Sequence, residues 1–363
     1  MKQVVTIARI LVGVLFIFSG LVKAIDPLGL AYKMQEFFDV WAADGIMRGL
    51  MLWLNEQALL FSLLMITLEV VLGVCLLLGW RTKMVSWLLL LLMLFFTFLT
   101  SFVLFSGKIR ACGCFGDCIP LTPVQTFTKD IILLILVLVI LFGRKHIKPL
   151  FSNKKNVILF LASFFGVLGL QWYVLHHLPV KDCLPFKVGN NILELRKMPA
   201  DAVPDKFDFK FIYKKNGAEK EFAVSALPDS SWEFADRKQV LIEKGKNNIP
   251  LINDFFLNSQ SGNDSTEAVL NQAGAYYLLF AKDFADGNTK WIESFELFAT
   301  KSIIPVYVVT SDPKTATKLI TNPSVTIFTC DATSIKTAAR VNPTLFLMNG
   351  PVIKNKWAAR DKF

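Results

Sequence analysis

The sequence predicts a membrane-embedded bundle of α-helices followed by a soluble α/β domain, with a β-rich section before that domain. Three observations point to this fold class. The chain of 363 residues is 53% hydrophobic and contains 32 Phe, and its mean hydropathy of +0.48 is too high for an ordinary soluble protein. Long apolar runs dominate the chain up to about residue 177, whereas the remainder alternates short apolar stretches with turn residues. The two halves are therefore expected to fold in different solvents.

Five apolar runs are each long enough to cross a hydrocarbon core of about 30 Å as a helix. They cover residues 4–25, 58–80, 84–106, 126–142 and 156–176. No small-x-small cleavage site follows the first run, so we interpret it as a retained span and not as a signal peptide. Four spans are expected to form a bundle at residues 1–145, and a cytoplasmic loop and the fifth span occupy residues 146–178.

Basic residues predict how these spans are oriented. Lys2, Arg9 and a cluster of Lys and Arg at 144–155 would lie on the cytoplasmic side. The segments 26–57 and 107–122, and everything after residue 178, would then lie in the periplasm, as in a multi-pass protein of the inner (cytoplasmic) membrane. The formal charge of +10 is spread between apolar runs and forms no continuous basic face, which argues against nucleic acid as a partner.

The segment 27–57 lies between the first two spans and has apolar residues at helical spacing, among them Met34, Phe37 and Trp41. Two interpretations remain open. The segment could lie along the outer membrane surface as an amphipathic helix, or it could pack across the mouth of the bundle.

The soluble half is expected to have two sections. Residues 179–264 form a linker and a β-rich section, because stretches such as 207–213 and 221–224 alternate and are separated by Asn-Gly and Pro-Asp turns. Residues 265–363 form the α/β domain. There, strands at 276–281 and 304–310 alternate with helices at 288–300 and 313–320, and a hairpin at 344–356 follows, which indicates a βαβ unit and a terminal hairpin.

The sharpest chemical signal is a cysteine-rich loop after the third span. Cys112, Cys114 and Cys118 lie within seven positions, and the glycines between them let the sulfurs approach one another, as thiol–disulfide exchange requires. Neighbouring Lys108 and Arg110 favour the thiolate form. We interpret the three cysteines as catalytic residues of a thiol–disulfide exchange reaction in an oxidising compartment.

Two other interpretations of this loop stay open. A permanent disulfide, for instance between Cys118 and Cys183, would make the loop structural. Cys114 and Cys118 could also bind a soft metal such as Cu(I), but no Met or His accompanies them in the loop, and we predict no metal site.

The membrane half resembles the DoxX superfamily, and in particular its MauE branch, over about residues 1–145. The resemblance rests on Arg9, on Ser19-Gly20 and Lys23 in the first span, on Glu69, Gly73 and Leu78-Gly79 in the second, and on Cys112-Gly113-Cys114-Phe115-Gly116. It implies a quinone- or thiol-linked redox role in a membrane, tied to thiosulfate oxidation or to the maturation of disulfide-rich partners. The fifth span and the soluble half depart from the family's minimal pattern.

Charged residues inside the spans form a second candidate site. A charge within a span is costly unless it is paired, so Glu69 is expected to face the bundle interior with Lys23 as its counter-ion. Lys129 and Asp130 lie in the same layer of the fourth span. Lys23, Glu69 and Lys129 would form either the wall of a quinone or thiol site or a buried polar clasp that fixes the register of the helices. The first of these two sites would take a quinone as its cofactor.

The C-terminal domain resembles the thioredoxin fold of the TlpA thiol-disulfide group, over about residues 265–358. The resemblance rests on 276–281, on 305–310 and above all on Arg340-Val341-Asn342-Pro343-Thr344. In that family a cis-proline before a strand lies against the active disulfide, and Pro343 matches it. The position of the family's Cys-x-x-Cys reads Asp283-Phe284-Ala285-Asp286-Gly287-Asn288. The resemblance thus implies a degenerate thioredoxin-like domain that binds a partner through Asn342 and Pro343.

These features together predict an inner-membrane protein that exchanges disulfide equivalents through its cysteine loop and docks an extracytoplasmic partner, as a thiol-disulfide or quinone-linked oxidoreductase would. The alternative is a non-catalytic membrane anchor or scaffold subunit of a cell-envelope complex, which suits the missing Cys-x-x-Cys. The expected partners are an extracytoplasmic client protein or subunits of a membrane complex, together with the lipid bilayer.

Overall fold

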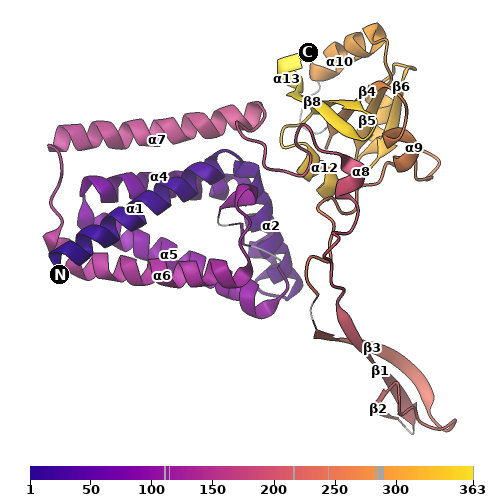
Figure 1. Ribbon diagram of the computed structural model, residues 1–363, viewed down its shortest axis with the longest axis horizontal. Helices are drawn as coiled ribbons and strands as arrows, with labels where there is room; N and C mark the ends of the chain where they lie inside the picture. Colours follow the sequence, from indigo (N-terminus) through magenta and orange to yellow (C-terminus); the bar gives the residue numbers. More distant parts are fainter. Residues whose placement is uncertain are drawn as a thin grey trace.

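The computed structural model describes residues 1–363 except 110, 111, 114, 216, 244, 283, 285–289 and 363. It contains a helical bundle, a domain built on a five-stranded sheet and a projecting three-stranded sheet, which we call the arm (Figure 1). The sheet domain lies at one end of the bundle, which we call the mouth. The N-terminus and the connection between α6 and α7 lie at the opposite end.

Five helices among the described residues are long and apolar enough to cross a membrane. They are α1 (Lys2–Ala24), α4 (Ala58–Leu78), α5 (Thr82–Ser106), α6 (Pro123–Gly143) and α7 (Asn153–His176). The five predicted spans are confirmed, with ends displaced by a few residues, as is usual for helix boundaries.

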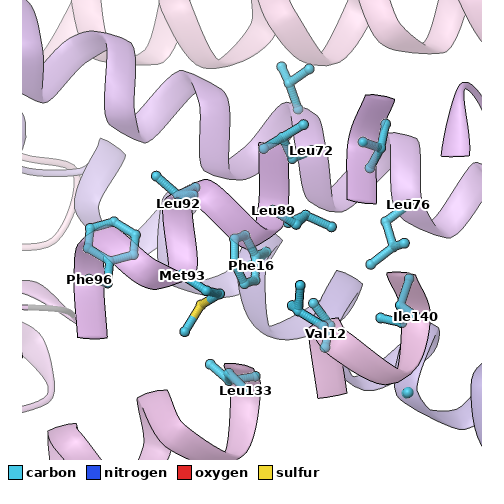
Figure 2. Close-up of a cluster of buried hydrophobic side chains, with 14 of the residues drawn as sticks. Val12, Phe16, Leu72, Leu76, Leu89, Leu92, Met93, Phe96, Leu133 and Ile140 are labelled. Carbon is cyan, nitrogen blue, oxygen red and sulfur yellow. The ribbon is translucent and has the colours of Figure 1, made fainter. Parts of the chain in front are cut away.

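The core of the bundle is formed by α1, α4, α5 and α6. Figure 2 shows their buried side chains meeting in one cluster, with Val12 and Phe16 from α1, Leu89 from α5 and Leu133 from α6. Helices α1 and α4 approach so closely that a Cβ added at Gly73 would lie only 2.9 Å from the Gly13 carbonyl oxygen. Glycine at this position permits that approach.

Helix α7 is attached to the side of this four-helix core and is the least buried of the five spans. It packs on α4, where Gln171 Nε2 donates a hydrogen bond of 2.9 Å to Thr67 Oγ1. The fifth span is thus an addition to a bundle of four.

Helices α2 (Pro27–Ala43) and α3 (Arg48–Glu56) follow α1 at the mouth. The Asp26 side chain caps α2 by accepting a hydrogen bond from Gly29 N, and Pro27 is preset for the first helical turn. Met34 and Phe37 are buried against the spans. For α2, the structure supports the helix packed across the mouth. In α3, by contrast, Leu50, Leu52 and Trp53 are exposed, so the two interpretations stay open for that helix.

The sheet domain has the strand order β6-β5-β4-β7-β8. Strands β4 (Ala275–Ala281), β5 (Val306–Thr310) and β6 (Val325–Thr329) are parallel, and β7 (Thr344–Asn349) and β8 (Val352–Ala358) continue the sheet antiparallel. The predicted βαβ unit and terminal hairpin are confirmed, with α10 (Lys290–Lys301) and α11 (Pro313–Leu319) as the predicted helices. Strand β6 and helix α12 (Ala332–Ala338) were not predicted. The short helices α8 (Ile192–Leu195), α9 (Thr266–Leu270) and α13 (Ala359–Lys362) complete the domain.

The arm consists of β1 (Lys206–Lys215), β2 (Ala218–Ala223) and β3 (Glu233–Glu243) in the order β2-β1-β3. Its two ends meet at Val203 and Lys246, whose backbones exchange hydrogen bonds of 2.8 and 3.0 Å. The predicted β-rich section is confirmed, and its stretches at 207–213 and 221–224 fall in the antiparallel pair β1 and β2, apart from residue 224. The arm leaves the sheet domain and projects clear of the bundle (Figure 1).

Candidate functional site

The cysteine loop lies at the mouth, between α5 and α6. Cys118 ends a single turn of 3-10 helix, Gly116–Cys118, and forms a disulfide with Cys183. Cys112 is buried, and Cys114 lies outside the described residues. The Cys118–Cys183 pair, one of the alternatives that the sequence left open, ties the loop to the segment that leads from α7 into the sheet domain.

Four charged side chains of the bundle gather directly beneath this loop. Lys23 of α1 forms a salt bridge with Glu69 of α4, and each is only 2% exposed. On α6, Lys129 Nζ lies 2.6 Å from Asp130 Oδ1. All four line one cavity of about 20 Å³, whose wall also includes Phe115 of the cysteine loop. The structure therefore brings together Lys23, Glu69 and Lys129.

The size of this cavity limits what it can hold. A volume of about 20 Å³ accommodates about one water molecule, whereas pockets for cofactor-sized ligands measure ~300 Å³ or more. A quinone ring does not fit the residues as they stand. Phe115 covers the cavity toward the loop, and Lys129 Nζ lies 5.1 Å from the centre of its ring.

A buried arginine joins the sheet domain to the mouth. Arg340 Nε donates hydrogen bonds of 2.8 and 3.1 Å to the two carboxylate oxygens of Asp26, and its Nη2 donates one of 3.0 Å to Asp117. The Arg340 guanidinium also lies over the Tyr32 ring, 5.3 Å from its centre. Because Asp117 precedes Cys118, one side chain links the cysteine loop, the start of α2 and the sheet domain. The sequence analysis did not single out this role of Arg340.

Asn342 and Pro343, the predicted partner-binding residues, follow Arg340 on the same loop. The Asn342–Pro343 peptide bond is cis, and Asn342 Oδ1 accepts a hydrogen bond of 2.8 Å from Lys282 N. Both line an open groove of about 700 Å³ between the sheet domain and the bundle, together with Trp291 and His176. They are thus accessible from the space between the two parts.

Two further ion pairs lie at the same boundary. His177 Nδ1 lies 2.6 Å from Asp361 Oδ1, and Lys356 Nζ lies 2.9 Å from Asp182 Oδ2. Burial lowers the pKa of Lys356, and the nearby Asp182 carboxylate opposes that shift. Both pairs connect the segment after α7 with the C-terminal end of the chain.

Cys330 offers a contrast with the loop cysteines. It is 2% exposed at the end of β6, and burial raises the pKa of its thiol to about 12. A thiol with such a pKa is almost entirely protonated at neutral pH and is a poor nucleophile.

Comparisons with known proteins find similarity in the membrane half and in the arm. Residues 1–143 match the family model described as methylamine utilisation protein MauE, and residues 207–244, which coincide with most of the arm, match a domain of unknown function (DUF8463). The chain is 31% identical over 165 residues to Protein TlpB of Flavobacterium psychrophilum, an alignment that covers 45% of this chain and 40% of that protein. The chain thus aligns with less than half the length of that curated relative. No solved structure matches this chain significantly. Its N-terminal part, residues 1–143, is a MauE-like membrane domain in a chain related to TlpB.

Proposed function

We propose that this protein is a membrane-bound thiol–disulfide exchange protein whose cysteine loop acts on a partner held by the sheet domain. The observation that carries the proposal is the set of contacts from the Arg340 guanidinium to Asp26 and Asp117, which we call the Arg340 fork. It holds the loop of Asn342 and Pro343 beside the loop that contains Cys118. The proposal locates the protein in the cytoplasmic membrane, with the mouth and the sheet domain in the periplasm.

The proposed reaction uses Cys112, Cys114 and Cys118. Cys118 is bonded to Cys183 in the structure, so it enters the cycle after a dithiol of the second partner protein reduces that bond, which leaves both sulfurs as thiols and a disulfide in that partner. A loop thiolate attacks a sulfur of a client disulfide, forms a mixed disulfide and expels one client thiolate. A second loop thiolate then attacks the loop sulfur of that mixed disulfide, which leaves a disulfide in the loop and a dithiol in the client. Two electrons pass from the loop to the client, and a dithiol of a second partner protein returns them. The same steps in reverse oxidise a client.

The sheet domain would serve as the client-binding module. Three parallel strands, an antiparallel hairpin and a cis-proline before β7 support a thioredoxin-like fold. The sequence has no cysteine at 283–288, so a domain of this fold would contribute binding without a redox centre of its own. The relationship to MauE and to TlpB is consistent with a redox-linked role.

Trapping a mixed disulfide tests this proposal, with Cys183 as the matched control. Both Cys118→Ser and Cys183→Ser break the Cys118–Cys183 disulfide, but only the first removes a proposed catalytic sulfur. We expect Cys114→Ser and Cys118→Ser to accumulate a mixed disulfide after a rapid alkylating quench, identified by mass spectrometry, while Cys183→Ser turns over as the wild type does. Identical behaviour of Cys118→Ser and Cys183→Ser, with no trapped client, would show a purely structural disulfide.

The second candidate function is a non-catalytic anchor or scaffold subunit of a cell-envelope complex. The disulfide and the ion pairs at the mouth favour it, because they fix the sheet domain to the bundle. Replacing Cys112, Cys114 and Cys118 together by Ser separates the two functions. A scaffold would still assemble with its partners and support the same phenotype, whereas an exchange protein would lose activity.

A further inference from the structure

We propose that Glu69 and Asp130 share one buried water molecule and one exchangeable proton beneath the cysteine loop. The cavity would then be a proton site and not only a clasp between helices. Its assignment to the loop thiols rests on the proposed function, but the site itself does not.

The first step of the argument is a count of hydrogen bonds. Glu69 Oε1 is engaged by Lys23 and Asp130 Oδ1 by Lys129. The second oxygens, Glu69 Oε2 and Asp130 Oδ2, are buried and have no hydrogen-bond partner among the described residues. Leaving a buried acceptor without a donor costs about 1–3 kcal/mol, and more for a charged group, so each oxygen requires a donor.

The second step concerns the space available. Glu69 and Asp130 are 2% and 1% exposed, and both line the cavity of about 20 Å³. That volume holds about one water, and one water carries two hydrogens. A single water molecule can therefore donate one hydrogen bond to Glu69 Oε2 and one to Asp130 Oδ2, which satisfies both acceptors without an extra protein group.

The third step concerns charge. The charged residues that line the cavity are Lys23 from α1, Glu69 from α4 and Lys129 and Asp130 from α6, while the residues from α5 are Met93 and Phe96. Two cations balance two carboxylates. A water that bridges the two second oxygens would let a proton on one carboxylate change the proton affinity of the other.

The site is placed to serve thiol chemistry in the loop. Phe115 of the loop forms part of the cavity wall, and Cys112 belongs to the same continuous buried cluster as Met93, Phe96 and Leu133 of that wall. When a loop thiol ionises before it attacks a disulfide, its proton would move through the water to a carboxylate. The proton would return to the thiolate that leaves, so that no net charge is created.

Infrared spectroscopy of the full chain in lipid nanodiscs tests the site, because the C=O stretch of a protonated carboxyl is distinct from carboxylate bands. We expect a carboxyl band that grows as the pH falls and that shifts in D2O. In Asp130→Asn and in Glu69→Gln the remaining carboxyl should titrate with a midpoint displaced by about one pH unit or more. Asp44→Asn, which removes a carboxylate from an ion pair with Lys108 outside the cavity, should leave the titration unchanged.

Unchanged midpoints in both variants would overturn the shared site, as would a wild-type band insensitive to D2O. If either variant fails to fold, Glu69→Asp and Asp130→Glu keep the charge and should still displace the midpoint, because they move an oxygen away from the water. The proton site and the exchange function are separated by testing in parallel whether the loop cysteines can be oxidised and reduced. A coupled site with inert loop cysteines would uphold the proton site and contradict the exchange function.

Discussion

At the scale of single residues, this chain buries charge in two different ways. Lys23 and Glu69 pair one to one between α1 and α4, and removing either partner would leave an uncompensated charge in the bundle. Arg340 instead divides its guanidinium between Asp26 and Asp117. A lysine could not reproduce this contact, because its ammonium is a point charge and not a planar fork. The arginine can therefore fix three segments of the chain at once.

Glu296 on α10 predicts a dependence of stability on acid pH. Its Oε1 accepts hydrogen bonds from the Thr321 backbone at 2.6 Å, the Thr321 hydroxyl at 3.0 Å and the Asn322 backbone at 3.2 Å. The bond from Thr321 N is the main cause that lowers the pKa of Glu296 below its usual value of 4.5. The resulting stabilisation is complete above the unfolded-state value and disappears as the pH falls through the lowered folded-state pKa.

We therefore expect Glu296→Gln to lower the melting temperature of the protein at pH 7, and the variant and wild type to converge as the pH falls well below 4.5. Thermal melts followed by circular dichroism in a series of buffers measure this. Glu293→Gln, an exposed change on the same helix, serves as the control. A constant difference between Glu296→Gln and wild type at every pH would contradict the account.

At the scale of elements, length decides what could be predicted from the sequence. The five spans were predictable because a helix across hydrocarbon needs about 20 consecutive apolar residues. Strand β6 spans only Val325–Thr329, with Ile327 and Phe328 as its buried residues, and α12 spans seven residues. Periodicity cannot identify such short pieces. Their places are set by tertiary contacts, above all the parallel pairing of β6 with β5.

The site likewise contains contacts that a local pattern predicts and contacts that it does not. The pair of Lys23 and Glu69 was predictable because a charge within a span requires a partner. The contact between Arg340 and Asp26 joins residues 314 positions apart, and neither has a local pattern that identifies the other. Cys183 could be named as a partner of Cys118 only as one of several pairings that the cysteines allow.

The arm is an element that should be separable from the rest of the fold. Its strands pair with one another, and none of its described side chains belongs to the two buried clusters of the sheet domain. On one face of the arm, aromatic contacts join Phe211 to Phe234 and Tyr213 to Phe222 across strands. Such cross-strand pairs stabilise a small sheet by a few tenths of a kcal/mol to about 1 kcal/mol each.

Replacing residues 204–245 by Asn-Gly should therefore leave the sheet domain folded. The backbones of Val203 and Lys246 already form an antiparallel bridge, which a two-residue turn can close. We expect the same hydrogen-exchange protection of β4 and β7 as in the full chain. A loss of protection in these strands would show that the arm is required for the fold of the domain. Replacing Gly217 by Ala tests the turn between β1 and β2 without removing the arm.

At the scale of the whole molecule, the disulfide and the ion pairs that join the bundle to the sheet domain among the described residues lie at the mouth. The Cys118–Cys183 disulfide, the Arg340 fork and the pairs Lys356–Asp182 and His177–Asp361 surround the cysteine loop and the segment after α7. A displacement of the sheet domain must therefore pull on the loop or break one of these links. Docking of the domain and the conformation of the cysteine loop are expected to be coupled.

Arg340 is the residue at which this coupling can be broken without touching a cysteine. Arg340→Ala leaves Asp26 without its guanidinium partner. Because the Asp26 side chain is 20% exposed, the loss is expected to be smaller than the ~3–5 kcal/mol typical of breaking a fully buried pair. We expect faster hydrogen exchange in the first turn of α2, in the loop at 115–119 and in the segment 336–343, while β4 and the spans keep their protection. Arg340→Lys should fall between wild type and Arg340→Ala because it keeps the charge and loses the fork. The control is Arg360→Ala, an exposed change in the same groove. Equal hydrogen exchange in the Arg340 and Arg360 variants would mean that the fork does not hold the sheet domain on the cysteine loop.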